Sequence, residues 1–269
     1  MRIPFIKMHG IGNDFVILDG RSEPLPLLNR TARAELANRY TGIGCDQLIL
    51  LEPSVTADLK MLIFNADGGE AGACGNAARA VGLLAGGPVQ IETASGMIVA
   101  RPDGGGVAVD MGRPRFDWQA VPLAYAIDTS AMPLAWEELR SPAAVSVGNP
   151  HLVFFVDDTE VVPLERLGPT IEHDPIFPEG VNVNVAQVSG PAALKLRVWE
   201  RGTGLTRACG TGACASAVAA LRRRLVSSPV KVALPGGELE IAWDGTGSVM
   251  MTGPARESFR GSFELEDFT

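Results

Sequence analysis

One short pattern occurs twice in this 269-residue chain and constrains its fold more than any other feature. In each copy a strand-like segment ends at a polar residue, a glycine-rich turn follows, and a cysteine opens an alanine-rich segment with high helix propensity. The cysteines are Cys74 and Cys209, and Asn65 and Glu200 stand at the same spacing before them. Each cysteine is therefore expected at a helix N-terminus.

Other pairs of residues repeat at nearly the same spacing as the two cysteines. Asn13 and Asn149 each follow a glycine, and Gln47 and Asn182 each stand beside an apolar run. Because these pairs keep the same order along the chain, the sequence predicts two copies of one fold.

The length suits two domains of ordinary size. We expect an α/β fold, more specifically α+β, with an N-terminal domain over residues 1–116 and a C-terminal domain over residues 117–258. The last segment, residues 259–269, is expected to return to the first domain as a strand, and the active site is expected in the cleft between the domains.

The helices after the two cysteines are apolar on nearly every side, which predicts that strands bury them. The segment 164–167 looks weak for a helix, and Asn184 is expected at the surface.

Composition excludes several classes of function. The net charge of −8 and the pI near 5.0 give no excess positive charge for binding nucleic acid. No apolar run is long enough to span a bilayer, and the N-terminal segment reads as a strand instead of a signal peptide. Four cysteines without a secretion signal indicate reduced thiols in the cytoplasm. Three histidines and no second close cysteine pair make a metal site unexpected.

Two matched thiols suit a particular reaction. Inverting a carbon centre needs a base on one face and an acid on the other, and a thiolate and a thiol can exchange these roles. A helix N-terminus is expected to lower the pKa of each thiol. Backbone amides there can hold a substrate carboxylate; they belong to Gly75, Asn76, Gly210 and Thr211. No lysine lies in these motifs, so pyridoxal phosphate is not expected, and we predict no cofactor.

These motifs resemble those of the diaminopimelate epimerase family along essentially the whole chain. They are Ala73-Cys74-Gly75-Asn76, Ala208-Cys209-Gly210-Thr211-Gly212, His9-Gly10-Ile11-Gly12-Asn13-Asp14-Phe15 and Gly148-Asn149-Pro150-His151. The resemblance implies two similar domains, each a barrel-like, mostly antiparallel sheet around a central helix. It implies a cofactor-independent isomerase that interconverts LL- and meso-diaminopimelate in lysine and peptidoglycan-precursor biosynthesis. It also implies a homodimer, although Phe259 stands where some members have a tyrosine at the dimer contact.

The resemblance also assigns roles to residues. It makes Cys74 and Cys209 the acid and base, and His151 and Glu200 the groups that adjust the pKa of the thiols. Arg201 suits a distant carboxylate as a bidentate partner, and Glu200 suits an ammonium. The substrate-binding residues would be Asn13, Gln47, Asn65, Gly75, Asn76, Asn149, Asn182, Glu200, Arg201, Gly210 and Thr211.

Three alternatives remain at this point. A proline or hydroxyproline racemase uses the same two-thiol logic, but Glu200 and Arg201 favour a substrate with a second amino-acid end. A phenazine-biosynthesis-like isomerase normally lacks the paired cysteines. A non-catalytic amino-acid-binding module would keep its binding after both cysteines were replaced. His151 is equally consistent with an ordinary hydrogen-bonded histidine at a strand end.

Overall fold

The computed structural model describes residues 1–72 and 74–268. Ala73 of the first cysteine motif and Thr269 at the end of the expected C-terminal strand lie outside the described residues. The chain forms two compact units, one from residues 1–109 and 253–269 and the other from residues 110–252. The expected boundaries at 116/117 and 258/259 lie a few residues later. One reason is that Arg115 exchanges backbone hydrogen bonds with Ser146, which ties the segment after residue 109 to the second unit.

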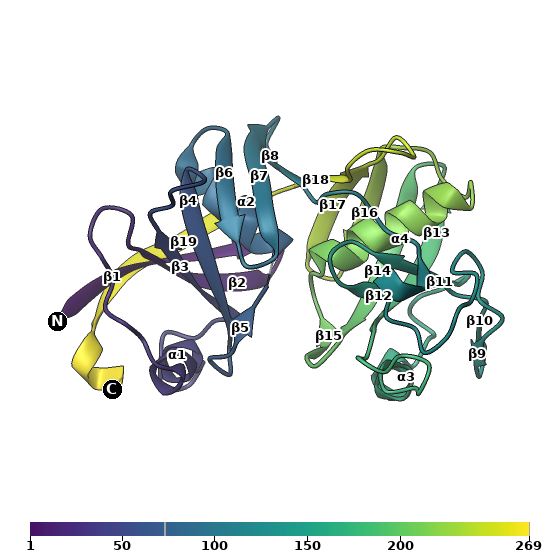
Figure 1. Cartoon of the computed structure of the whole chain (residues 1–269), viewed down its shortest axis with the longest axis horizontal. Coiled ribbons are helices and arrows are strands. Elements are labelled where there is room, and N and C mark those ends of the chain that lie inside the picture. Colours follow the sequence, from purple (N-terminus) through teal and green to yellow (C-terminus); the bar gives the residue numbers. More distant parts are fainter. Residues whose placement is uncertain (73, 269) are drawn as a thin grey trace. The chain divides into compact units, whose positions relative to one another are not determined.

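The first unit is a twisted sheet packed against helices (Figure 1). Strand β1 pairs antiparallel with β2 and with the C-terminal strand β19, β2 runs parallel to β3, and β4 pairs with β3 and β6. Its strands are β1 (Arg2–Gly10), β2 (Asn13–Asp19), β3 (Gln47–Glu52), β4 (Leu59–Asn65), β5 (Glu70–Ala71), β6 (Val89–Thr93), β7 (Gly96–Asp103), β8 (Gly106–Asp110) and β19 (Arg256–Glu264). Its helices are α1 (Arg30–Ala37), α2 (Gly75–Ala85) and the short 3₁₀ helix η2 (Leu265–Phe268).

The second unit repeats this order of pairings. Strands β11 and β12 are antiparallel, β12 and β13 are parallel, and β14 pairs with β13, β15 and β16, as β4 does with β3, β5 and β6. The elements are η1 (Trp118–Ala120), β9 (Ala135–Trp136), β10 (Leu139–Arg140), β11 (Ala143–Ser146), β12 (Pro150–Phe155), α3 (Leu164–Glu172), β13 (Asn182–Gly190), β14 (Ala193–Glu200), β15 (Gly204–Thr206), α4 (Gly210–Arg222), β16 (Val230–Leu234), β17 (Gly237–Ala242) and β18 (Met250–Gly253). The predicted duplication and the mixed α/β class with mostly antiparallel strands are confirmed.

The helix after each cysteine is the buried centre of its unit. Helix α2 contacts β1, β6 and β7, and α4 contacts β11, β12, β13, β14, β16 and β17 (Figure 1). Alanine and glycine let the strands approach closely, since a Cβ at Gly82 would lie 2.7 Å from a Val107 methyl. Burial of these apolar helices stabilises each unit and holds the helix N-termini in place. Among the described residues, no helix is long and apolar enough to cross a membrane.

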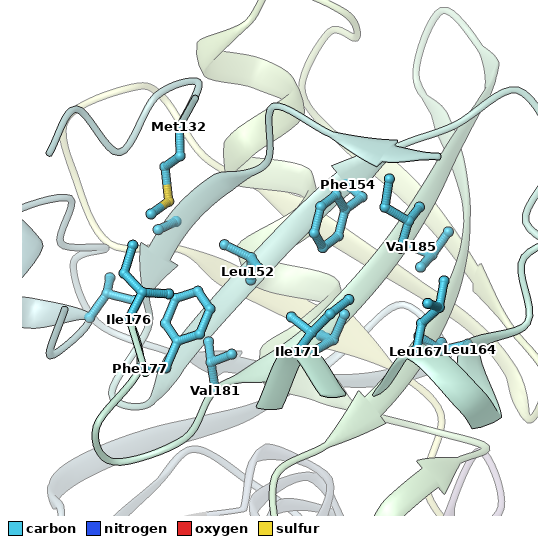
Figure 2. Close-up of a cluster of buried hydrophobic side chains, with 14 of the residues drawn as sticks. Met132, Leu152, Phe154, Leu164, Leu167, Ile171, Ile176, Phe177, Val181 and Val185 are labelled. Carbon is cyan, nitrogen blue, oxygen red and sulfur yellow. The ribbon is translucent and has the colours of Figure 1, made fainter. Parts of the chain in front are cut away.

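Helix α3 corrects one expectation from the sequence. Residues 164–167 looked too weak for a helix, yet α3 runs through Leu164–Glu172 and packs on β13 and β14. Leu164, Leu167 and Ile171 share one helix face and lie in an apolar cluster with residues of β12 and β13 (Figure 2). Tertiary packing thus stabilises a helix that contains Pro169 and has little intrinsic propensity.

Candidate active site

The first candidate thiol lies where α2 begins. Cys74 is the N-cap of α2, and its sulfur accepts a hydrogen bond from the Ala77 amide at 3.4 Å. Asn13 opens β2 and places Oδ1 3.7 Å from the Cys74 sulfur and 3.0 Å from Nδ2 of Asn76. The structure therefore brings Asn13, Cys74 and Asn76 together.

A charged cluster fixes the orientation of the Asn13 amide. Nδ2 of Asn13 donates to the Asp46 carboxylate at 3.0 Å, and Arg39 bridges Asp46 and Asp14 with two contacts of 2.6 Å. Burial alone would raise the pKa of Asp14, but hydrogen bonds from Arg39 and Lys7 outweigh it and lower that pKa to about 2. Because a carboxylate only accepts, Asn13 turns its NH₂ group toward Asp46 and its oxygen toward the thiol. Asp46 and Arg39 were not among the site residues predicted from the sequence.

Two side-chain amides, those of Gln47 and Asn65, lie at strand ends of the first unit. Gln47 and Asn65 stand opposite each other on β3 and β4, and Nε2 of Gln47 donates to Oδ1 of Asn65 at 3.3 Å. In the second unit the matching positions are Asn182 and Glu200. Oδ1 of Asn182 accepts from the Arg201 amide at 3.0 Å, and its Nδ2 donates to the Pro150 carbonyl at 2.7 Å.

The second candidate thiol lies where α4 begins. The Cys209 sulfur accepts from the Gly212 amide at 3.3 Å and lies 3.6 Å from Oγ1 of Thr211. Burial, followed by the negative charge of Glu200, raises the pKa of Cys209 well above its usual value, against the opposing hydrogen bonds of Thr211 and Gly212. The expectation that the helix N-terminus lowers this pKa is wrong here, because the residue is only 3% exposed and faces a carboxylate.

Similarity to known proteins supports the reading of the motifs. The family model described as diaminopimelate epimerase matches residues 5–116 and 143–257. A diaminopimelate epimerase from Erythrobacter litoralis is 61% identical over 269 residues, which cover 100% of both chains. The chain belongs to the diaminopimelate epimerase family.

Two solved structures share the fold of this diaminopimelate epimerase family member at low sequence identity. A phenazine biosynthesis protein of the PhzF family from Enterococcus faecalis has a TM-score of 0.73 at 14% identity, covering 98% of this chain and 100% of its own. A hydroxyproline epimerase from Agrobacterium vitis has a TM-score of 0.68 at 17% identity, covering 97% and 91% of the two chains. At these identities the likeness concerns the fold alone.

A buried histidine lies beside the second thiol of this diaminopimelate epimerase family member. His151 on β12 is fully buried, with Nε2 3.0 Å from Oδ1 of Asn149 and Nδ1 3.1 Å from Nδ2 of Asn184. Burial lowers the pKa of His151 to about 3, so the ring is neutral at pH 7. Nδ2 of Asn149 in turn donates to Oγ1 of Thr211 at 3.3 Å.

Asn184 also differs from its expected position. It was expected at the surface but is fully buried, because β13 lies between β12 and β14 and α4 covers the face that carries Asn184. The alternating pattern Asn182-Val183-Asn184 carries the signal that would have revealed this, since it places both asparagines on one face of the strand.

Two charged residues of the predicted set have partners outside the thiol clusters. Nη1 of Arg201 donates to the Glu179 carbonyl at 2.8 Å, and the side chain is exposed. Glu200 accepts a hydrogen bond from the Thr206 hydroxyl and also raises the pKa of Cys209. The Glu179 carbonyl thus holds the Arg201 side chain, which follows β14, against the loop before β13.

We expect His151 to make the folded protein sensitive to acid. The pKa of His151 is about 3 when folded and about 6.5 in an unfolded chain, so below pH 6.5 only the unfolded chain binds this proton. The free energy of unfolding should therefore fall by about 1.4 kcal/mol per pH unit between about pH 6 and about pH 3 through this residue alone. Urea unfolding of the wild type and His151→Gln at several pH values measures this slope.

The His151→Gln variant should show a correspondingly shallower loss of stability toward acid. His173→Gln, which removes an exposed histidine, is the control and should leave the slope unchanged. Parallel curves for wild type and His151→Gln would contradict the burial of a neutral His151.

Proposed function

We propose that this enzyme interconverts LL- and meso-diaminopimelate by a two-base mechanism, in which Cys74 and Cys209 act as base and acid on opposite faces of the α-carbon. Its membership of the family, with identity to relatives over the whole chain, makes it a cofactor-independent isomerase of lysine biosynthesis. We further propose that its product also supplies peptidoglycan precursors. The observation that carries the mechanism is that each repeat places a cysteine as the N-cap of its buried central helix.

We propose that, in the form that binds substrate, Cys209 carries the proton and acts as the acid while Cys74 acts as the base. Burial and the Glu200 charge favour the protonated form of Cys209, which supports this assignment. Cys74 removes the α-proton from one face of the substrate, and Cys209 delivers its own proton to the opposite face. The enzyme then holds a Cys74 thiol and a Cys209 thiolate, which is the form that catalyses the reverse reaction.

Substrate binding uses the groups around each thiol. We propose that backbone amides of Gly75, Asn76, Gly210 and Thr211 hold the α-carboxylate and stabilise charge as the C–H bond breaks. Glu200 binds an ammonium and Arg201 binds the distal carboxylate. Side-chain amides complete the set, and they belong to Asn13, Gln47, Asn65, Asn149 and Asn182. His151 and Glu200 set the proton affinity of Cys209.

Proton NMR in deuterated water under reducing conditions tests this proposal. LL-diaminopimelate, meso-diaminopimelate, proline, 4-hydroxyproline and lysine are offered separately, and loss of the α-proton signal is followed. Exchange with diaminopimelate alone supports the proposal. Exchange with proline or hydroxyproline would assign a racemase instead, and binding without any exchange would indicate an amino-acid-binding module.

We also propose a cytoplasmic homodimer. Four cysteines suit a reducing compartment, and Phe259 on β19 is an exposed aromatic residue, 51% accessible, at the position where the family resemblance implies a dimer contact. Sedimentation velocity should give twice the mass of one chain, and cell fractionation should recover the enzyme with cytoplasmic markers. A single species with the mass of one chain would refute the dimer.

A further inference from the structure

The second unit buries a polar pair where the first unit has apolar residues. His151 stands opposite Asn182 on β12 and β13, as Phe15 stands opposite Gln47 on β2 and β3. By the same register Asn184 matches Ile49 of the first unit. A buried polar group costs free energy unless it is hydrogen-bonded, and the first unit shows that packing at these positions does not require one.

Hydrogen bonds determine which way the Asn184 amide points. Its Nδ2 lies 2.9 Å from the Leu152 carbonyl and 3.1 Å from Nδ1 of His151. Because carbonyls only accept, the atom that faces the Leu152 carbonyl, and the Asn182 carbonyl at 3.4 Å, is the NH₂ group; Nδ1 of His151 faces the same NH₂ group and is therefore the unprotonated ring nitrogen. The proton of the neutral imidazole therefore sits on Nε2.

A chain of hydrogen bonds leads from His151 through Asn149 to Thr211, beside the Cys209 sulfur. The Nε2–H of His151 donates to Oδ1 of Asn149, which turns Nδ2 of Asn149 toward Oγ1 of Thr211. Since Thr211 accepts that bond, its own hydroxyl hydrogen is free to point at the Cys209 sulfur, 3.6 Å away. A thiolate at Cys209 would accept this hydrogen bond and be stabilised by it.

Asn184 also contacts the turn that carries Cys209. Its buried Oδ1 has no hydrogen-bond donor among the described residues and faces Gly212 in the first turn of α4. A Cβ at Gly212 would lie only 2.6 Å from this oxygen, so Gly212 allows α4 to approach Asn184 closely. Asn184 is thus held between His151 and the helix start that presents the thiol.

We propose that Asn184 is a positioning residue that fixes the His151 tautomer and, through Asn149 and Thr211, aims a hydroxyl hydrogen at the Cys209 sulfur. This inference rests on the proposed role of Cys209 in proton transfer. It predicts that the hydrogen bond forms when Cys209 becomes a thiolate during turnover. In the first unit Phe15 and Ile49 stand at the positions that match His151 and Asn184.

The tautomer is measured directly by ¹⁵N NMR of the imidazole nitrogens at pH 7. The chain has three histidines, and the His151 signals are assigned by their loss in His151→Gln. The wild type should show a protonated Nε2 and an unprotonated Nδ1. A wild-type ring protonated at Nδ1 would overturn the proposal, whatever the activity of the enzyme.

Asn184→Asp tests the link to the reaction with a side chain of the same shape. A carboxylate cannot donate to Nδ1, so His151 should become protonated at Nδ1, and the relay toward Thr211 should reverse. We expect kcat to fall by about 10- to 100-fold, the effect of losing one hydrogen bond to a charged group. Gln187→Leu, on the other face of β13, is the matched control and should change neither the tautomer nor kcat.

Two results with the Asn184→Asp variant would overturn the proposal. One is an Asn184→Asp protein that keeps the wild-type tautomer, and the other is one that changes tautomer while kcat stays the same. If Asn184→Asp does not fold, Asn184→Leu takes its place and should populate both tautomers with a similar loss of kcat. Absence of turnover in the wild type would refute the proposed function alone, since the wild-type tautomer is read without substrate.

Discussion

Replacing Cys74 or Cys209 by alanine should lower kcat for diaminopimelate epimerisation by about 10³- to 10⁴-fold. Each variant lacks a proton donor or acceptor on one face of the α-carbon, and a positioned acid or base typically contributes up to about 10⁴-fold. The remaining thiol can still exchange an α-proton with solvent from its own face. Each variant should therefore exchange deuterium into one stereoisomer without inverting it, and the two variants should act on opposite stereoisomers.

Cys45→Ala is the matched control for these variants. Cys45 is a buried free thiol in the core of the first unit, and burial raises its pKa to about 11. The substitution should cost about 1 kcal/mol of stability through the small cavity it leaves, without changing kcat. The two-thiol mechanism would be refuted by a folded Cys74→Ala or Cys209→Ala protein whose kcat stays within tenfold of the wild type.

Arg201→Met should lower kcat/KM for diaminopimelate by about 10²- to 10³-fold. A bidentate pair with a carboxylate makes two charge-assisted hydrogen bonds, each worth about 1.5–3 kcal/mol, and partial exposure of the site favours the lower value. Arg201 is already oriented, because its Nη1 donates to the Glu179 carbonyl and its stem packs on Gly180. Preorganisation of this kind reduces the entropy lost on binding.

Comparing diaminopimelate with lysine as substrates distinguishes binding of the distal carboxylate by Arg201 from a general loss of activity. Lysine lacks the distal carboxylate, so any slow α-proton exchange with lysine should be the same in the wild type and Arg201→Met. Arg140→Met, which removes an exposed arginine of the β9–β10 hairpin, is the control and should leave both substrates unaffected. An equal loss on diaminopimelate and lysine would show that Arg201 acts on the fold or the thiols, not on the distal carboxylate.

Local sequence determined the features that each segment encodes by itself. A glycine turn followed by cysteine and an alanine-rich run specifies a helix start, so the positions of Cys74 and Cys209 followed from the chain. The nearly equal spacing of Asn13 with Asn149 and of Gln47 with Asn182 revealed the duplication. Repeated order along a chain requires no knowledge of distant contacts, which is why this level of the fold was predictable.

Tertiary structure decided everything that depends on which segments meet. Asp46 reaches Asn13, and Asn184 reaches His151, only because parallel strand pairs bring these residues together, and their sequence separation carries no mark of it. Helix α3 exists because its apolar face finds a core. The proton affinity of Cys209 was misjudged from the helix N-terminus alone, because burial and a neighbouring carboxylate act through space and outweigh the local dipole.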